Sequence, residues 1–195
     1  MKKVYLIHGW GGSSGEGWFS WLKRNLEKQD FKVYVFNMPD SNNPKIEAWV
    51  KYLEENVKDV DKNTFFIGHS IGCQTIMRFL EKLPKHLEIG GCIFVAGWFN
   101  LKVESYESEE ERIIAKPWIN IEIDFSRITQ HTNKFLAIFS DDDLFVPLTD
   151  IKLFKERLNA KTILLKNKGH FDNAEEFEEA YKYILDFLLK NHNRK

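Results

Sequence analysis

Six short apolar runs lie along the chain and are separated by longer segments of mixed polarity. Each run has four to six residues, is rich in Val, Ile and Phe, and does not alternate with polar residues. Continuous apolar runs of this length are typical of strands that are buried on both faces of a parallel sheet. The predicted strands are Lys3–Ile7, Lys32–Phe36, Thr64–Ile67, Gly91–Ala96, Phe135–Phe139 and Lys161–Leu165.

Segments with helical periodicity lie between these runs. The predicted helices are Trp18–Gln29, Ile46–Val57, Gly72–Leu83, Pro147–Leu158 and Ala174–Lys190. In the last of them, apolar residues recur every three or four positions and form one face: Phe177, Tyr181, Ile184, Leu185 and Leu188. The alternation of strand and helix predicts a doubly wound α/β sheet with right-handed crossovers. Ligands of such sheets bind at the carboxyl ends of the strands, so we expect the site there.

One connection, residues 97–131, is much longer than the others. It carries a glutamate cluster and then the sequence Lys116-Pro117-Trp118; the cluster consists of Glu104, Glu107, Glu109, Glu110 and Glu111. A connection of this length inside a compact domain is often a functional lid. The alternative interpretation is a solvated helix with no role in binding. We therefore expect one domain over residues 1–195, with a lid-like insertion at about 97–131.

Composition and charge exclude several classes of protein. The chain has 195 residues, which predicts one domain, and 28 Lys and Arg balance 29 Asp and Glu. With a net charge of −1, the chain lacks the excess of positive charge that attracts nucleic acid or anionic lipid. Cys73 and Cys92 lie 19 residues apart without companions, so neither a disulfide framework nor a zinc site is predicted, and both are expected to be buried.

The start of the chain predicts a strand and not a targeting segment. Only four apolar residues, Val4 to Ile7, precede His8, whereas a secretory signal needs about 7–15. No run approaches the roughly 18 apolar residues of a membrane helix. The expectation is a soluble cytoplasmic protein with no membrane or nucleic-acid partner, no cofactor and no metal.

The glycine-rich loop after the first strand, residues 8–15, invites a test for phosphate binding. The dinucleotide fingerprint requires a third glycine where Ser14 stands. The phosphate loop requires Gly-Lys followed by Ser or Thr, but Gly17 is followed by Trp18. Nucleotide binding by either route is disfavoured.

The loop after the third strand carries Gly68-His69-Ser70-Ile71-Gly72, a G-x-S-x-G motif. In such a motif a sharp strand-to-helix turn crowds the backbone at the serine, and glycine two residues to either side leaves room for it. The serine oxygen then lies above the sheet, beside a helix N-terminus that favours negative charge. We predict Ser70 as a nucleophile; the alternative is a structural serine in a tight turn.

A serine nucleophile needs a general base, and His170 is the predicted one. Six histidines are available: His8, His69, His86, His131, His170 and His192. His170 directly follows the sixth strand and so lies at the edge where Ser70 emerges. His69 is expected to point away from its neighbour, and His8 to brace the glycine-rich loop. The alternative for His170 is a surface loop histidine.

The base needs a carboxylate that fixes its tautomer. The loop after the fifth strand offers Asp141-Asp142-Asp143, followed by Leu144-Phe145-Val146-Pro147. We predict Asp143, because its D-x-x-V-P setting leads into Pro147 as a first helical residue. Asp142 is the alternative, and Asp141 is expected to shape the turn. The chain order Ser70, Asp143, His170 is that of α/β-hydrolases.

The rest of the predicted site consists of backbone donors and aromatic walls. An oxyanion needs preorganised N–H groups, and we predict those of Ile71 and Trp10, with Gly11 as the alternative to Trp10. Aromatic side chains follow three strands at the same edge and predict a shallow apolar pocket for short acyl groups; they are Trp10, Trp98, Phe99, Phe145 and, from the long connection, Trp118.

Together these motifs resemble the small serine hydrolases of the retinoblastoma-binding protein 9 and YdeN type, a branch of the α/β-hydrolase superfamily. The similarity runs over nearly the whole chain and rests on H-G-W-G-G-S, G-H-S-I-G, Pro117-Trp118, D-D-x-F-V-P and G-H-F. The resemblance implies a three-layer α/β sandwich with a six-stranded, mostly parallel sheet in the order 2-1-3-4-5-6. It also implies that Ser70, Asp143 and His170 are nucleophile, acid and base.

These observations favour a carboxylesterase-like serine hydrolase that acts on a small-molecule ester through an acyl-enzyme. Thioesters and amides are alternative substrates, and acyl transfer to a non-water acceptor uses the same residues. A binding or scaffold protein is the alternative from another class. Dehalogenase chemistry is disfavoured because it requires Asp as the nucleophile in the strand-to-helix turn, called the nucleophile elbow, where this chain has Ser70. Neither cysteine lies in an L-x-C-x-E motif, so no retinoblastoma-protein contact is implied, and the sequence leaves the identity of any protein partner open.

Overall fold

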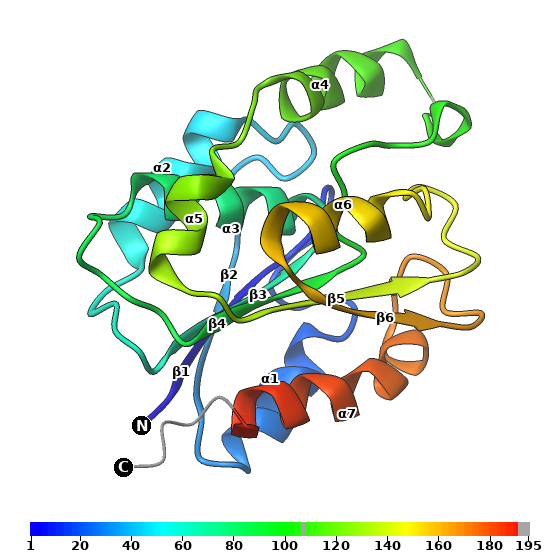
Figure 1. Cartoon of the computed structure of the whole chain (residues 1–195). Coiled ribbons are helices and arrows are strands. Elements are labelled where there is room, and N and C mark those ends of the chain that lie inside the picture. The colour runs from blue at the N-terminus through cyan, green and yellow to red at the C-terminus, as the bar shows by residue number, and fades with distance from the viewer. Residues whose placement is uncertain (107, 191–195) are drawn as a thin grey trace.

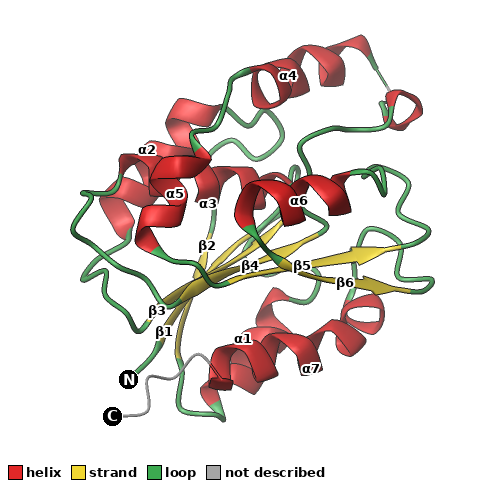
Figure 2. Cartoon of the chain, in the orientation of Figure 1, coloured by secondary structure: helices red, strands yellow, loops and turns green. Residues whose placement is uncertain are grey.

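The strands form one parallel sheet in the order β2-β1-β3-β4-β5-β6 (Figures 1 and 2). The computed structural model describes residues 1–106 and 108–190. Every neighbouring pair within this sheet is parallel, and the order confirms the predicted topology. The strands are β1 (Lys3–Ile7), β2 (Lys32–Phe36), β3 (Thr64–His69), β4 (Gly91–Val95), β5 (Phe135–Ser140) and β6 (Lys161–Leu165).

Helices cover both faces of the sheet. α1 and α7 lie on one face, and α2, α3, α5 and α6 lie on the other, with α4 farther out on that side (Figure 1). The helices are α1 (Phe19–Glu27), α2 (Ile46–Asn56), α3 (Ile71–Lys82), α4 (Glu109–Asn120), α5 (Phe125–His131), α6 (Asp150–Leu158) and α7 (Ala174–Lys190), with a short 3₁₀ helix η1 at Val103–Ser105.

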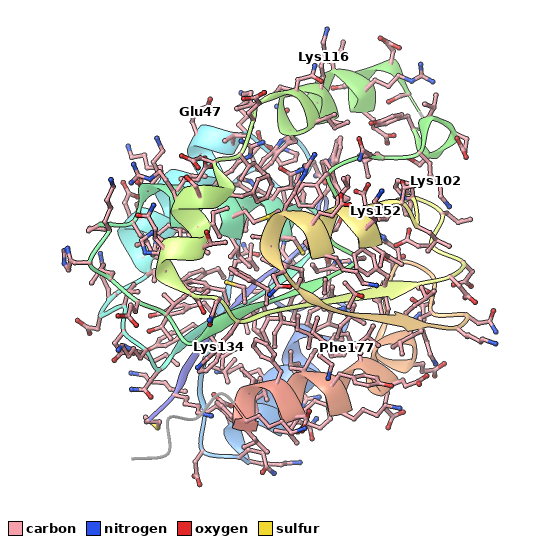
Figure 3. All side chains as sticks on the ribbon, viewed as in Figure 1. Glu47, Lys102, Lys116, Lys134, Lys152 and Phe177 are labelled. Atoms are coloured by element: carbon pink, nitrogen blue, oxygen red, sulfur yellow. The ribbon has the colours of Figure 1, made fainter. Side chains whose placement is uncertain are left out.

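Two hydrophobic cores hold the three layers together. Successive strand residues point to opposite faces, so Leu6 and Phe65 belong to the core under α1 and α7, whereas Ile7 and Phe66 belong to the other. Phe177 lies between α7 and the sheet (Figure 3). The buried residues of α7 recur at helical spacing, as predicted, although Tyr181 and Leu185 are only partly buried.

The predicted elements match the observed ones to within a few residues. The largest difference is the start of α6, which begins at Asp150 and not at Pro147. The carbonyl groups of residues 147–149 instead accept hydrogen bonds from the N–H groups three positions later, as in a 3₁₀ turn. Asp150 N–H donates to the Pro147 carbonyl, and Ile151 N–H donates to the Leu148 carbonyl. Pro147 therefore begins a turn that leads into the helix, and the prediction of Pro147 as its first residue was wrong.

The long connection 97–131 divides into two parts with different roles. α5 packs between α3 and α6 and is the crossover helix that joins the parallel strands β4 and β5. α4 begins after Ser108, whose Oγ accepts a hydrogen bond from Glu111 N–H (3.2 Å). The three glutamates of its first turn lie where a helix N-terminus favours negative charge. Glu107 lies outside the described residues. That this connection is a lid-like insertion stays a prediction.

Cys73 and Cys92 are both buried and unpaired, as predicted. Among the helices of residues 1–106 and 108–190, none is both long and apolar enough to cross a membrane.

Candidate active site

Ser70 lies in a strained turn between β3 and α3. Its φ of 51° and ψ of −123° are unusual for a residue with a side chain, and its N–H donates to the Val95 carbonyl of β4 (3.0 Å). Strain of this kind is concentrated at functional sites. The turn places Ser70, 9% exposed, at the N-terminus of α3 and at the carboxyl edge of the sheet.

The glycines of the G-x-S-x-G motif are required by close backbone contacts. A Cβ on Gly72 would lie 2.5 Å from the Ile7 carbonyl oxygen, and one on Gly68 would lie 2.7 Å from Cys73 N. Both distances are too short for any side chain, so the elbow geometry depends on these two residues. The predicted reason for the motif is confirmed.

His170 and Asp143 form a hydrogen-bonded pair at the same edge. His170 Nδ1 lies 2.8 Å from Asp143 Oδ2. Asp143 is only 3% exposed, and its other oxygen, Oδ1, accepts the N–H groups of Phe145 (2.8 Å) and Val146 (3.0 Å). A carboxylate that is held in this way requires the proton on Nδ1 of the neutral imidazole, and Nε2 is then free to accept a proton.

The neighbouring aspartates hold the loop between β6 and α7 that carries His170. Asp142 Oδ1 accepts the Ser140 hydroxyl (2.6 Å) and Gly169 N–H (2.9 Å), and the Ser140 bond lowers the pKa of the Asp142 carboxyl. Asp141 Oδ1 accepts Asn167 N–H (2.9 Å). Of the three, the structure brings Asp143 to His170, which favours Asp143 over the alternative, Asp142.

The glycine-rich loop after β1 approaches Ser70 closely. A Cβ on Gly9 would lie 3.3 Å from Ser70 Cβ. Gly11 N–H donates to the Ser41 carbonyl (2.8 Å) and Gly12 N–H to the Gly9 carbonyl (3.3 Å), so neither is available to a substrate. Of the two predicted donors of this loop, this favours Trp10 N–H over Gly11 N–H for the oxyanion site.

His8 braces this loop, as predicted. Its Nε2 accepts a hydrogen bond from Met38 N–H (2.9 Å), so the proton is on Nδ1, which donates to the Gly9 carbonyl (2.8 Å). Burial lowers the pKa of His8 and favours this neutral form. None of the other three histidines is among the residues that line the cavity: His86 is exposed between α3 and β4, His131 Nδ1 donates to the Leu87 carbonyl, and His192 lies outside the described residues.

Ser70 and His170 both line one cavity of about 320 Å³. Three of the predicted aromatic walls line it, namely Trp10, Trp98 and Phe145. The sequence did not predict several other lining residues, which come from the segment after β4, from α4 and from the loop after His170: Leu101, Ser105, Tyr106, Glu111 and Asp172.

Phe99 and Trp118 do not line this cavity, and their predicted place in its wall was wrong. The buried Asp150 carboxylate accepts hydrogen bonds from the backbone N–H groups of Phe99 and of Asn100, the latter at 2.9 Å. These bonds hold residues 99–100 toward α6. Trp118 is 1% exposed, and its Nε1 donates to the Pro44 carbonyl (3.0 Å). Both rings contribute to the hydrophobic core between the sheet and the outer helices.

Comparison with known proteins agrees with this geometry. The family model described as "Serine hydrolase" matches residues 4–188. The chain belongs to this serine hydrolase family. Putative hydrolase YdeN of Bacillus subtilis (strain 168) is 31% identical over 192 residues, which are 97% of each chain. Serine hydrolase RBBP9 of Rattus norvegicus is 27% identical over 192 residues, 95% of each chain.

The structural comparison gives the same family. The crystal structure of the ydeN gene product from B. subtilis matches with a TM-score of 0.85 at 29% identity, and the match covers 97% of this chain and 100% of that one. The predicted resemblance and the α/β-hydrolase fold are therefore confirmed. Membership assigns the chain to the hydrolases. Within its described residues, this serine hydrolase has no group of three or more His, Cys, Asp or Glu that could hold a metal ion.

His69 is part of this hydrolase's site in a way that the sequence did not predict. His69 is among the residues that line the cavity, and its Nε2 lies 2.7 Å from the His170 carbonyl oxygen. Burial, and after it the nearby His170 imidazole, lowers the pKa of His69 from the ordinary 6.5 to about 3. The signal was its position beside Ser70, but only the loop geometry shows where the ring goes.

This buried histidine makes the stability of the fold depend on pH. Below pH 6.5 the unfolded chain protonates His69, while the folded chain does not until about pH 3. Its contribution to stability is therefore complete above pH 6.5 and is lost as the pH falls toward 3. Between pH 7 and 5 we expect about 2 kcal/mol of loss from this group. Urea unfolding of wild type and His69→Gln across this range measures it; equal slopes would contradict the assignment.

Proposed function

We propose that this chain hydrolyses small carboxylic esters through an acyl-enzyme on Ser70. The observation that carries the proposal is the Asp143–His170 hydrogen bond beside a cavity that also exposes the elbow serine. In each half of the reaction His170 moves one proton, and Asp143 keeps the imidazole in the tautomer that can accept it.

The first half of the reaction forms the acyl-enzyme. Ser70 Oγ attacks the ester carbonyl carbon while His170 Nε2 takes its proton. The carbonyl oxygen becomes an oxyanion, which the N–H groups of Trp10 and Ile71 stabilise. The tetrahedral intermediate then breaks the bond to the leaving alcohol, and His170 returns the proton to the alcohol oxygen.

The second half releases the acid. Water attacks the acyl carbon and gives a proton to His170 Nε2, and the second tetrahedral intermediate expels Ser70 Oγ, which regains that proton. A fluorophosphonate probe and a panel of p-nitrophenyl esters test the mechanism together. Covalent labelling at Ser70 with burst release of p-nitrophenol is the expected result. A folded protein that neither reacts with the probe nor turns over any ester is inconsistent with the proposal.

The cavity favours short acyl groups. Trp10, Trp98 and Phe145 are its aromatic walls, and its volume of about 320 Å³ is at the small end for ligand pockets. Acyl chains of roughly two to six carbons should gain at most about 0.8 kcal/mol per buried CH₂, and longer chains should gain nothing more. The measurement is kcat/KM against acyl length. A steady rise through long-chain esters would contradict this prediction and indicate a lipase.

The charge of the cavity wall favours neutral over anionic acyl groups. Glu111 and Asp172 contribute carboxylates, and none of the described residues that line the cavity is Lys or Arg. Lys102, whose ammonium donates to the Asp143 carbonyl oxygen, is not among them. We expect p-nitrophenyl hemisuccinate to show roughly tenfold lower kcat/KM than the uncharged p-nitrophenyl succinamate, because like charges repel at short range.

The control for this charge effect is a pair of isosteric variants. Glu111→Gln and Asp172→Asn remove the negative charges and should narrow the difference between the two esters, while leaving the succinamate rate similar. If the wild type hydrolyses both esters equally well, the carboxylates of the wall do not select the substrate.

A further inference from the structure

Two buried rings hold successive carbonyl groups of the loop that carries His170. His69 Nε2 lies 2.7 Å from the His170 carbonyl oxygen, and Trp18 Nε1 donates to the Phe171 carbonyl oxygen over 2.8 Å. A carbonyl oxygen can only accept, so the proton of the neutral His69 ring is on Nε2. The two bonds join residues 101 and 153 positions apart in the chain.

The backbone at this point has a conformation that needs support. Phe171 has a φ of 59°, in the left-handed region that bulky residues rarely adopt. Such strain persists only where the surroundings fix it. The Phe171 side chain is completely buried, its N–H donates to the Lys168 carbonyl (3.0 Å), and Trp18 holds its carbonyl.

The two donor rings are themselves fixed by packing. The Trp18 ring stacks on Phe177 of α7 with centroids 3.8 Å apart and planes 2° apart. Its centroid lies 5.8 Å from that of His69 in an edge-on contact, and the His69 ring centroid lies 4.9 Å from that of His170. Trp18 is 1% and His69 is 7% exposed; the Trp18 bond is buried, and the His69 bond is partly buried.

We infer that His69 and Trp18 are positioning residues that place the imidazole of His170 relative to Ser70 by holding the His170 and Phe171 carbonyls. His69 directly precedes Ser70, so one short stretch of β3 and its elbow fixes the nucleophile and the backbone of the base together. Asp143 fixes the tautomer of His170 through a hydrogen bond to the imidazole, whereas the two rings fix the location of His170 through hydrogen bonds to main-chain carbonyl groups. The effect of the two rings on turnover rests on the proposed function. Their hydrogen bonds to the loop of His170 do not depend on that function.

The test uses two substitutions of His69 that differ mainly in hydrogen bonding. Glutamine is able to donate an amide N–H from the position of Nε2, whereas methionine has similar length and volume but no donor. We expect His69→Gln to retain kcat for p-nitrophenyl butyrate to within about fivefold, and His69→Met to lose roughly 10- to 100-fold, mostly in kcat, because small misplacements of a base are costly. Equal losses in both variants would overturn the inference.

A spectroscopic measurement separates positioning from general destabilisation. The proton between His170 Nδ1 and Asp143 Oδ2 should give a far-downfield proton resonance in wild type and His69→Gln. We expect it to be broadened or shifted in His69→Met, at a temperature where thermal melts show all three proteins folded. An unchanged resonance in a folded His69→Met protein would show that the ring does not position the base.

Trp18→Phe provides the second arm. It keeps an aromatic ring against Phe177 but removes the donor to the Phe171 carbonyl, so we expect the same downfield resonance to broaden and kcat to fall more than KM changes. Full kcat and an unchanged resonance would remove Trp18 from the inference. If wild type hydrolyses no ester, the proposed function fails, and the resonance alone still decides whether the two rings hold His170.

Discussion

Replacing Ser70 with alanine is expected to lower kcat for p-nitrophenyl esters by roughly 10⁴- to 10⁶-fold, because the variant lacks the atom that forms the acyl-enzyme. The backbone should tolerate the change. Ser70 N–H donates to the Val95 carbonyl and its carbonyl accepts from Cys73 N–H, and neither bond involves the side chain. The steric constraints of the elbow lie in Gly68 and Gly72, which stay in place. Steady-state kinetics with a thermal melt of the same sample measures both effects.

The matched control is Ser105→Ala. Ser105 lines the same cavity, and its Oγ donates to the Lys102 carbonyl (2.6 Å), so it is a second serine that a probe in the cavity could reach. We expect this variant to keep its activity to within a few fold and to be labelled by a fluorophosphonate at Ser70. Label on Ser105, or turnover that survives in a folded Ser70→Ala protein, would contradict the assignment of the nucleophile.

The parallel sheet explains why so much of this site follows from the sequence. Strands buried on both faces leave continuous apolar runs, and the loops after such strands must meet at one edge. Ser70 follows β3, Asp143 follows β5 and His170 follows β6, so their convergence needed only the order of the elements. The glycine-rich loop after β1 reaches the same edge for the same reason.

What the sequence left open depends on the direction of individual loop bonds. Asp141, Asp142 and Asp143 are chemically alike, and only their partners distinguish them: two aspartates bind the loop of the base, and one binds the base. Phe99 was placed in the wall because it follows β4, but the Asp150 carboxylate turns that stretch toward α6. Tyr106 and Glu111 come from the long connection 97–131, which the sequence marked as lid-like without indicating which of its side chains reach the cavity.

Asparagine at position 143 should be the most damaging conservative change outside Ser70, with kcat lowered roughly 10²- to 10⁴-fold at neutral pH. The geometry gives the reason. Oδ1 of Asp143 accepts two N–H groups, from Phe145 and Val146, and only the carbonyl oxygen of an asparagine can take that place. The amide NH₂ must then face His170 Nδ1, which forces the ring proton onto Nε2. In that tautomer His170 cannot accept the proton of Ser70.

Asp142→Asn and Asp141→Asn serve as its controls. Oδ1 of Asp142 accepts the Ser140 hydroxyl and Gly169 N–H, and an asparagine oxygen can accept both, so we expect a loss of less than about tenfold. Among the described residues, the Asp141 carboxylate accepts a hydrogen bond from Asn167 N–H, which lies farther from His170 in the chain. We expect Asp141→Asn to lower kcat by less still. The kcat of the three variants on one ester, compared at equal folded fraction, gives the ranking. If Asp142→Asn is the damaging change and Asp143→Asn is mild, Asp142 is the acid of the triad.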